Sequence, residues 1–65
     1  GVHVQGIAAD ILVGHLPSGE ILRLTSLATR IGFKGIGVAL ANPIRSKRFL
    51  HLDSRSDDNA AIWSY

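Results

Sequence analysis

RFLHLD, residues 48–53, alternates charged or polar residues with apolar ones, and this pattern predicts a β-strand. Residues two apart on a strand face the same side of a sheet, so we expect His51 and Asp53 to point into one cleft. The predicted strand therefore combines an apolar surface, which needs a covering layer, with an imidazole and a carboxylate.

An amphipathic helix is predicted before this strand, over residues 20–31, because apolar residues recur there at spacings of three and four. They are Ile21, Leu24, Leu27, Ala28 and Ile31. Ser18 is expected as the N-cap and Gly32 as a left-handed C-cap. Glu20 and Arg30 carry the charges that the two ends of the helix dipole favour.

Two further strands are predicted, over residues 8–13 and 35–40, and the glycines of the second would allow another backbone to approach closely. Residues 62–65 are expected to pack back on the domain. The order β-α-β-β predicts the α+β class, with a small mixed sheet, expected to be mostly antiparallel, and one helix packed on one face. Residues 1–65 would form a single domain or a fragment of one.

The length of 65 residues allows only one domain, and a domain of this size buries about 60% of the surface that its unfolded chain exposes. Such small domains usually depend on disulfides, a metal ion or a partner, and the absence of cysteine excludes disulfides. We therefore expect a metal ion or adjoining protein structure to stabilise the chain. Because the sequence begins two residues before His3, an N-terminal segment of a parent chain is expected to precede it.

The composition argues against several classes of protein. A hydrophobic content of 46% and a mean hydropathy of +0.22 are too apolar for a disordered chain. The longest apolar runs are far shorter than the roughly 20 residues of a membrane span, and no signal-peptide pattern is present. The seven Lys and Arg residues are scattered apart from a cluster at residues 45–48, so no nucleic-acid partner is expected.

His3, Asp10 and His51 are the candidate metal ligands, and they would converge if the first and third predicted strands are neighbours. Two neutral imidazoles and one carboxylate suit Zn²⁺, with ligand distances of about 2.0–2.2 Å. Three protein ligands leave a fourth position for water, as in hydrolytic zinc sites. The competing interpretation is that these histidines are hydrogen-bonded packing residues. His15, beside Gly14 and a turn, is predicted to be a surface residue.

Several segments together carry a resemblance to a known family. His3, Gly6, Ala8 and Asp10 match the H-x-x-G-x-A-x-D signature of the zinc D-alanyl-D-alanine carboxypeptidases. These enzymes form metallopeptidase family M-fifteen, which has the DD-peptidase/Hedgehog-type fold. The segments GFKGIG (residues 32–37), FLHLDSR (49–55) and WSY (63–65) resemble later parts of the same family in the same order. The resemblance covers nearly the whole chain.

The resemblance implies that His3, Asp10 and His51 bind zinc and that the protein hydrolyses peptidoglycan stem peptides, at D-Ala-D-Ala or a related bond. Gly6 would permit a tight backbone between the first two ligands, and Ala8 would leave room beside the metal. A protein of this kind belongs in the bacterial cell envelope, periplasmic or secreted, or in a phage lysis or tail structure.

The sequence departs from the family at the general base, because Arg48 occupies the position where the family often has an acid or a histidine. Asp53 is the candidate replacement; alternatively, it fixes an imidazole or pairs with Arg55. Arg55 in turn is either a binding residue for a substrate carboxylate or a solvated surface residue. A second function therefore stays open, a non-catalytic, zinc-stabilised module that binds the cell wall or another protein.

Overall fold

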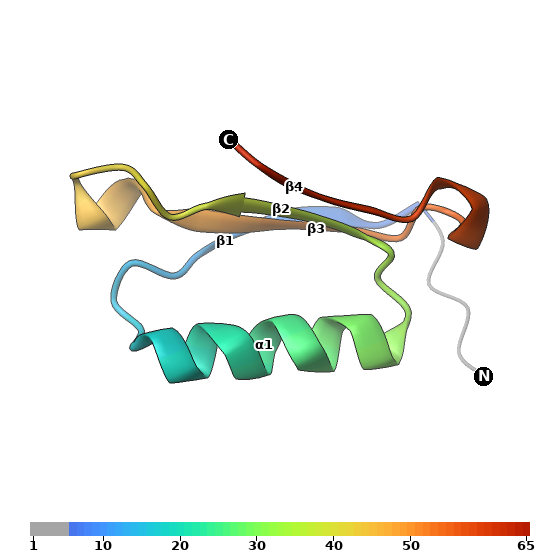
Figure 1. Ribbon diagram of the computed structural model, residues 1–65, viewed down its shortest axis with the longest axis horizontal. Helices are drawn as coiled ribbons and strands as arrows, with labels where there is room; N and C mark the ends of the chain where they lie inside the picture. Colours follow the sequence, from blue (N-terminus) through green and yellow to red (C-terminus); the bar gives the residue numbers. More distant parts are fainter. Residues whose placement is uncertain (1–5) are drawn as a thin grey trace.

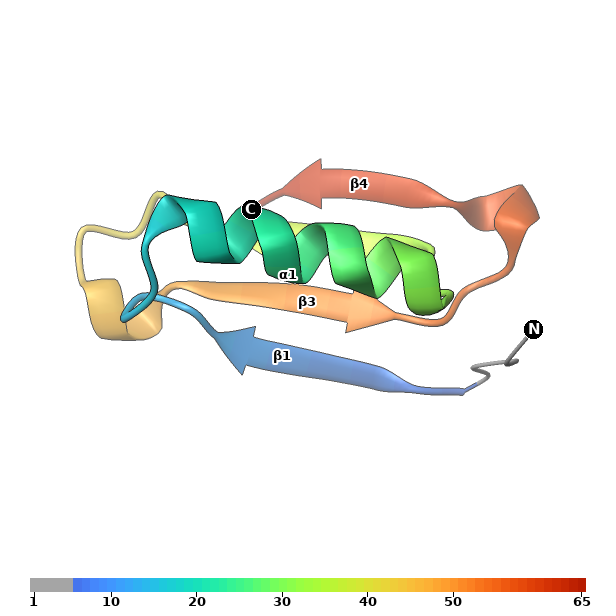
Figure 2. The ribbon, with the colours of Figure 1, turned by 90° about the horizontal axis from the view of Figure 1, so that it is seen from below.

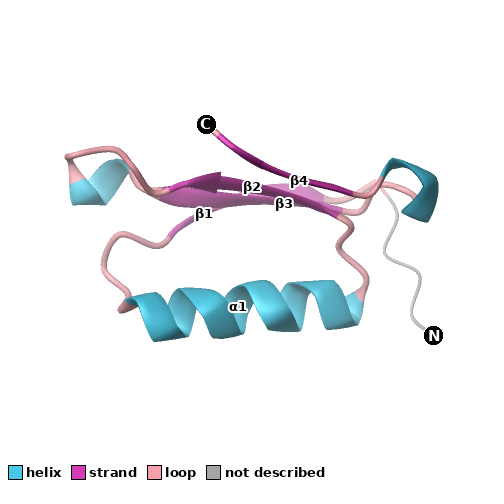
Figure 3. Ribbon diagram, viewed as in Figure 1, coloured by secondary structure: helices cyan, strands magenta, loops and turns pink. Residues whose placement is uncertain are grey.

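The computed structural model describes residues 6–65 and places one helix across one face of a four-stranded sheet (Figure 1). The main elements are β1 (Ala8–Leu12), α1 (Ser18–Ile31), β2 (Gly35–Ala39), β3 (Phe49–Asp53) and β4 (Ala61–Ser64). Two short 3₁₀ helices, η1 (Arg45–Lys47) and η2 (Asp57–Asn59), flank β3 in the chain (Figure 3). The predicted α+β class, with one helix on one face of a small sheet, is confirmed.

The strand order is β1-β3-β2-β4, so the strand that carries His51 lies inside the sheet (Figure 2). β3 is antiparallel to both β1 and β2, whereas β4 is parallel to β2. The sheet is therefore mixed, as predicted, but the parallel β2–β4 pair corrects the expectation that it is mostly antiparallel. Both edges of β3 are already occupied, so the chain that leaves β3 and reverses pairs with an outer edge of the sheet, here that of β2, and the reversal makes that pairing parallel.

The helix joins two strands that are parallel to each other and separated by β3, an arrangement known as a split β-α-β unit. Its C-cap is Gly32 with φ 112°, as predicted, and the Gly32 backbone N–H is bonded to carbonyl oxygens of the last helical turn. The predicted N-cap is wrong. Pro17 is the N-cap, and its carbonyl accepts the N–H groups of Glu20 and Ile21, so Ser18 is already helical.

The hydrophobic core lies between α1 and the sheet. Ala28, Ile36 and Leu52 form a buried cluster. Ile11, Phe33 and Val38 pack against that cluster and are partly buried. The predicted helical stripe is buried only in part, because Leu27 and Ile31 remain 53% and 48% exposed. Among residues 6–65, Figure 1 shows no helix on the opposite face of the sheet, and this open face carries the residues described next.

Candidate metal centre

Asp10 and His51 face each other across the β1–β3 pair, where they are direct register partners. Their chain neighbours Ile11 and Leu52 pack toward the core, so Asp10 and His51 point to the open face. Nδ1 of His51 lies 2.8 Å from Oδ1 of Asp10. The expectation that the first and third predicted strands are neighbours is confirmed, and two of the three candidate ligands are in contact.

The second nitrogen of the same ring is occupied as well. Nε2 of His51 lies 2.9 Å from Oδ2 of Asp53, as expected for residues two apart on one strand. A neutral imidazole has a single N–H, so it can donate to only one of these two carboxylates, and its other nitrogen faces an oxygen lone pair. Either a second proton or a metal cation on that nitrogen removes the repulsion. In the metal-free protein the hydrogen bonds to Asp10 and then to Asp53 raise the pKa of His51.

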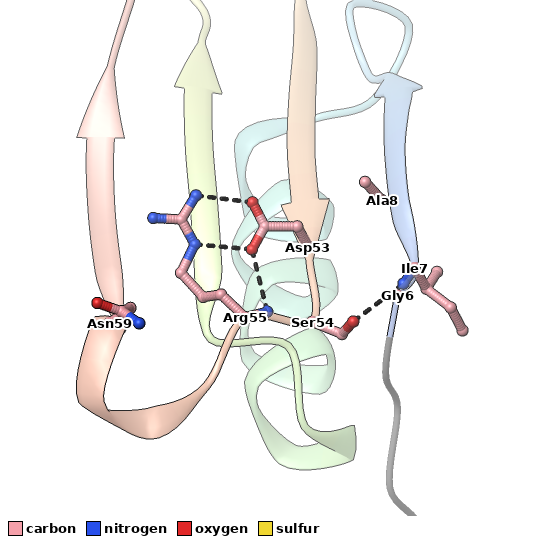
Figure 4. Close-up of a pocket in the computed structure, with 7 residues that line it drawn as sticks. All are labelled: Gly6, Ile7, Ala8, Asp53, Ser54, Arg55 and Asn59. Atoms are coloured by element: carbon pink, nitrogen blue, oxygen red, sulfur yellow. Dashed lines mark hydrogen bonds and ion pairs between the residues drawn. The ribbon is translucent and has the colours of Figure 1, made fainter.

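Asp53 is held on its other side by Arg55. The Arg55 Nε and Nη2 groups donate to Oδ1 and Oδ2 of Asp53 at 2.8 Å each, and the Arg55 backbone N–H also donates to Oδ1 (Figure 4). These bonds to Arg55, and then the one to His51, hold the pKa of Asp53 well below its usual range. A carboxylate that binds a proton so weakly is a poor general base near neutral pH, so the contacts favour the role of fixing the imidazole.

Two glycines of β2 provide the space in which these side chains lie. A Cβ atom on Gly35 would collide with the Asp53 carboxylate and with Nε of Arg55. A Cβ on Gly37 would lie 2.7 Å from Nε1 of Trp63 and 2.8 Å from Cε2 of Tyr65, which is also too close. The sequence predicted that the glycines admit another backbone. The glycines instead leave space for side chains that come from β3, from β4 and from the residues that follow these strands, and that lie across β2.

The C-terminal segment packs back on the domain, as expected, and contributes aromatic side chains to the open face. The Arg55 guanidinium carbon lies 4.7 Å from the ring centroid of Trp63, within the range of a cation–π interaction. The ring centroids of His51 and Trp63 are 5.6 Å apart. Tyr65 and Phe49 extend this aromatic surface, with centroids 5.2 Å apart.

A shallow cavity of about 500 Å³ lies next to this cluster, at the end of the sheet where β3 ends and β1 begins (Figure 4). Its lining consists of Gly6, Ile7, Ala8, Asp53, Ser54, Arg55 and Asn59. Ser54 fixes one wall, because its hydroxyl accepts the Ile7 N–H and its own N–H donates to the Ile7 carbonyl, both at 3.0 Å. Gly6 has φ 69°, a left-handed conformation that favours glycine and turns the chain just before this wall.

The facing atoms of Asp10 and His51 fit a shared cation. Tetrahedral zinc ligands at about 2.1 Å from the metal lie about 3.4 Å from each other. The observed 2.8 Å would therefore widen by about 0.6 Å. The Asp10 side chain is 64% exposed, so it has room to move. Within residues 6–65, however, no three His, Cys, Asp or Glu side chains are grouped to hold a metal ion, because Asp53 contacts the other ring nitrogen.

The remaining predicted residues fall in different places. His3 lies outside the described residues, so the complete ligand set stays a prediction. His15 is exposed, as predicted. Arg48 does not join the cluster, because its Nε donates to the Asn42 carbonyl at 2.6 Å.

Sequence reasoning missed Trp63, Gly35 and Gly37 as parts of the site. The two glycines could have been found from their spacing, because residues two apart in β2 lie on the same face of the sheet. In the β2–β3 pair they lie beside His51 and Asp53.

Comparisons with protein-family models, with curated proteins and with solved structures gave no match to this chain. In the part of the chain that the structure describes, α1 is too short and too polar to span a membrane, and no other helix is longer.

Proposed function

We propose that the protein is a zinc-dependent peptidase that hydrolyses peptidoglycan stem peptides, at D-Ala-D-Ala or a related bond. The observation that carries the proposal is the contact between Nδ1 of His51 and Oδ1 of Asp10 on an open face of the sheet. This pair joins a nitrogen and an oxygen donor of the kinds that zinc prefers, and solvent reaches it. The motif resemblance supplies the third ligand, His3, and the substrate class.

The residues of the cluster would divide the work. Asp10 and His51, with His3, would hold the metal, while Asp53 accepts the Nε2–H of His51 and fixes the ring. When bound, zinc supplies a water molecule whose pKa is lowered to about 7 and polarises the scissile carbonyl. Asn59 and Arg55 line the cavity beside Asp53 and would contact a peptide bound there. Nη1 of Arg55 takes no part in the pair with Asp53 and is the atom with which Arg55 would bind a substrate carboxylate.

Digestion of purified muropeptides tests this function. The chain is supplied with Zn²⁺, and the products are identified by mass spectrometry. We expect release of D-alanine or cleavage of the stem peptide by the unmodified chain and by Arg23→Gln, whose side chain is 81% exposed on α1. Asp10→Ala is expected to lose the activity. Equal digestion by the unmodified chain and by Asp10→Ala would contradict the proposal.

The second candidate function is a non-catalytic, zinc-stabilised module that binds cell wall or another protein. One observation favours it, because the two residues considered at the general-base position are otherwise engaged. Asp53 is bonded to Arg55 and His51, and Arg48 is bonded to the loop that precedes β3. Zinc binding and retention on peptidoglycan without any cleaved product would favour this module. Either function would place the protein in the bacterial envelope or in a phage lysis or tail structure.

A further inference from the structure

Arg55 has a geometry that suits an internal role better than a role in binding substrate alone. Its side chain crosses β2 beside Gly35 and uses two of its nitrogens on Asp53, a residue only two positions earlier. These two bonds fix the positions of both Asp53 oxygens. Oδ2 lies 2.9 Å from Nε2 of His51. The position of Arg55 therefore determines where the carboxylate that holds the imidazole can lie.

Two further features keep Arg55 in this position. On the sheet side, Gly35 leaves the space for Nε, since a Cβ there would collide with both Arg55 and Asp53. On the other side, the Trp63 ring lies 4.7 Å from the guanidinium carbon. The guanidinium is thus held between a glycine and an indole, while the Asp53 side chain is only 15% exposed. An arginine that only covered the surface would need neither the glycine nor the ring.

We propose that Arg55 is a positioning residue for the metal ligand His51, acting through Asp53, and that Gly35 is required because it provides the space for this pair. Asp53, fixed by Arg55, accepts the Nε2–H of His51 and leaves Nδ1 as the nitrogen directed at Asp10. Loss of the guanidinium frees Asp53 to rotate, so that the ring is no longer held in one orientation and one tautomer. This inference rests on the proposed zinc site.

Zinc affinity in a double-mutant cycle tests the proposal. The affinities of the unmodified chain, Arg55→Gln, Asp53→Asn and the double variant are measured by competition with a chromophoric chelator. Loss of a carboxylate that holds a metal-binding histidine typically weakens metal affinity by about 10–100-fold, and we expect this for Asp53→Asn. Arg55→Gln should weaken binding by about 10-fold or more on the same scale. The double variant should be no weaker than Asp53→Asn, because Arg55 acts through Asp53.

The matched control is Arg23→Gln, which also removes an arginine paired with a carboxylate, but at an exposed position on α1. It should leave zinc affinity unchanged. Gly35→Ala should lower the affinity like Arg55→Gln, and it provides a second test if Arg55→Gln does not fold. Circular dichroism establishes which variants are folded.

A second readout does not depend on metal. In the metal-free protein at a pH where His51 is neutral, ¹⁵N NMR should show the proton on Nε2 in the unmodified chain and a mixture of both tautomers in Arg55→Gln. Zinc affinity and tautomer in Arg55→Gln equal to those of Arg23→Gln would overturn the inference while leaving the zinc site intact. Absence of zinc binding by the unmodified chain would instead overturn the proposed function, and the inference with it.

Discussion

The two faces of the sheet are built from alternate residues of the same strands, yet they differ in almost every physical property. Toward α1, β3 contributes Leu50 and Leu52, which are 1% and 4% exposed. Toward the open face, the same strand contributes His51 and Asp53, which are bonded to other polar side chains. The covered face therefore forms the hydrophobic core, and the open face holds the bonded polar cluster on which the proposed zinc site rests.

The covered face should be the more sensitive to a change in side-chain volume. Leu52→Ala leaves a cavity in the small cluster with Ala28 and Ile36, and we expect it to lower the free energy of unfolding by about 2–5 kcal/mol. Urea denaturation followed by circular dichroism measures this loss. Leu22→Ala, at a position 71% exposed on α1, is the control and should change the value by less than about 0.5 kcal/mol. Similar losses for the two variants would contradict this division between core and surface.

The open face should contribute strongly to stability once a cation is bound. Zn²⁺ at a hundred times its dissociation constant is expected to stabilise the folded chain by about 2.7 kcal/mol, because the unfolded chain has no assembled site. The midpoint of thermal unfolding with zinc and then with excess EDTA measures the effect. The same additions should leave the midpoint of His51→Ala unchanged, and a shift as large as that of the unmodified chain would place the metal elsewhere.

Gly37 tests the packing of the open face without touching a charged residue. Gly37→Ala forces Trp63 and Tyr65 away from β2, and overpacking of this kind typically costs about 1–3 kcal/mol. Tryptophan fluorescence should shift toward that of an exposed indole, and urea denaturation gives the loss in stability. Gly19→Ala is the matched control, because a Cβ there meets nothing within 4 Å. Equal stability of the two variants would show that the Trp63 and Tyr65 rings do not pack against Gly37.

The smallest expected effect is a loss of stability in acid. The pKa of Asp53 is lowered in the folded protein by Arg55, whereas an aspartate in the unfolded chain has a pKa of about 3.9. Its stabilising contribution is therefore present above pH 3.9 and is lost as the pH falls below about that value. With EDTA present, the unfolding free energy should fall less between about pH 5 and pH 3 in Asp53→Asn than in the unmodified chain. Parallel pH profiles would contradict this contribution.

Much of the fold follows from the local sequence pattern. The periodicity of α1, the left-handed Gly32 and the alternation in β3 each reflect a short-range requirement of the backbone, and the structure contains all three. The partner of the C-terminal strand was not predicted, because the local pattern does not reveal which of the two outer edges of the sheet that strand joins. Burial of Leu27 was overestimated for a related reason, since periodicity does not reveal how wide a layer the helix covers.

The candidate site was predictable where it follows from strand geometry. The contact between His51 and Asp53 follows from their spacing, and that between Asp10 and His51 from the adjacency of two strands. The role of Arg55 was not resolved, because its Nε and Nη2 could bind either Asp53 or a ligand, and only the three-dimensional structure distinguishes these partners.

The central claim is that Asp10 and His51 share one zinc ion with His3. Elemental analysis of the purified chain after dialysis against a trace of zinc tests this claim most directly. We predict one zinc ion per chain for the unmodified protein and for Arg23→Gln, and none for His3→Ala, Asp10→Ala and His51→Ala. No zinc in the unmodified protein, or full retention of zinc by the Asp10 and His51 variants, would contradict the claim.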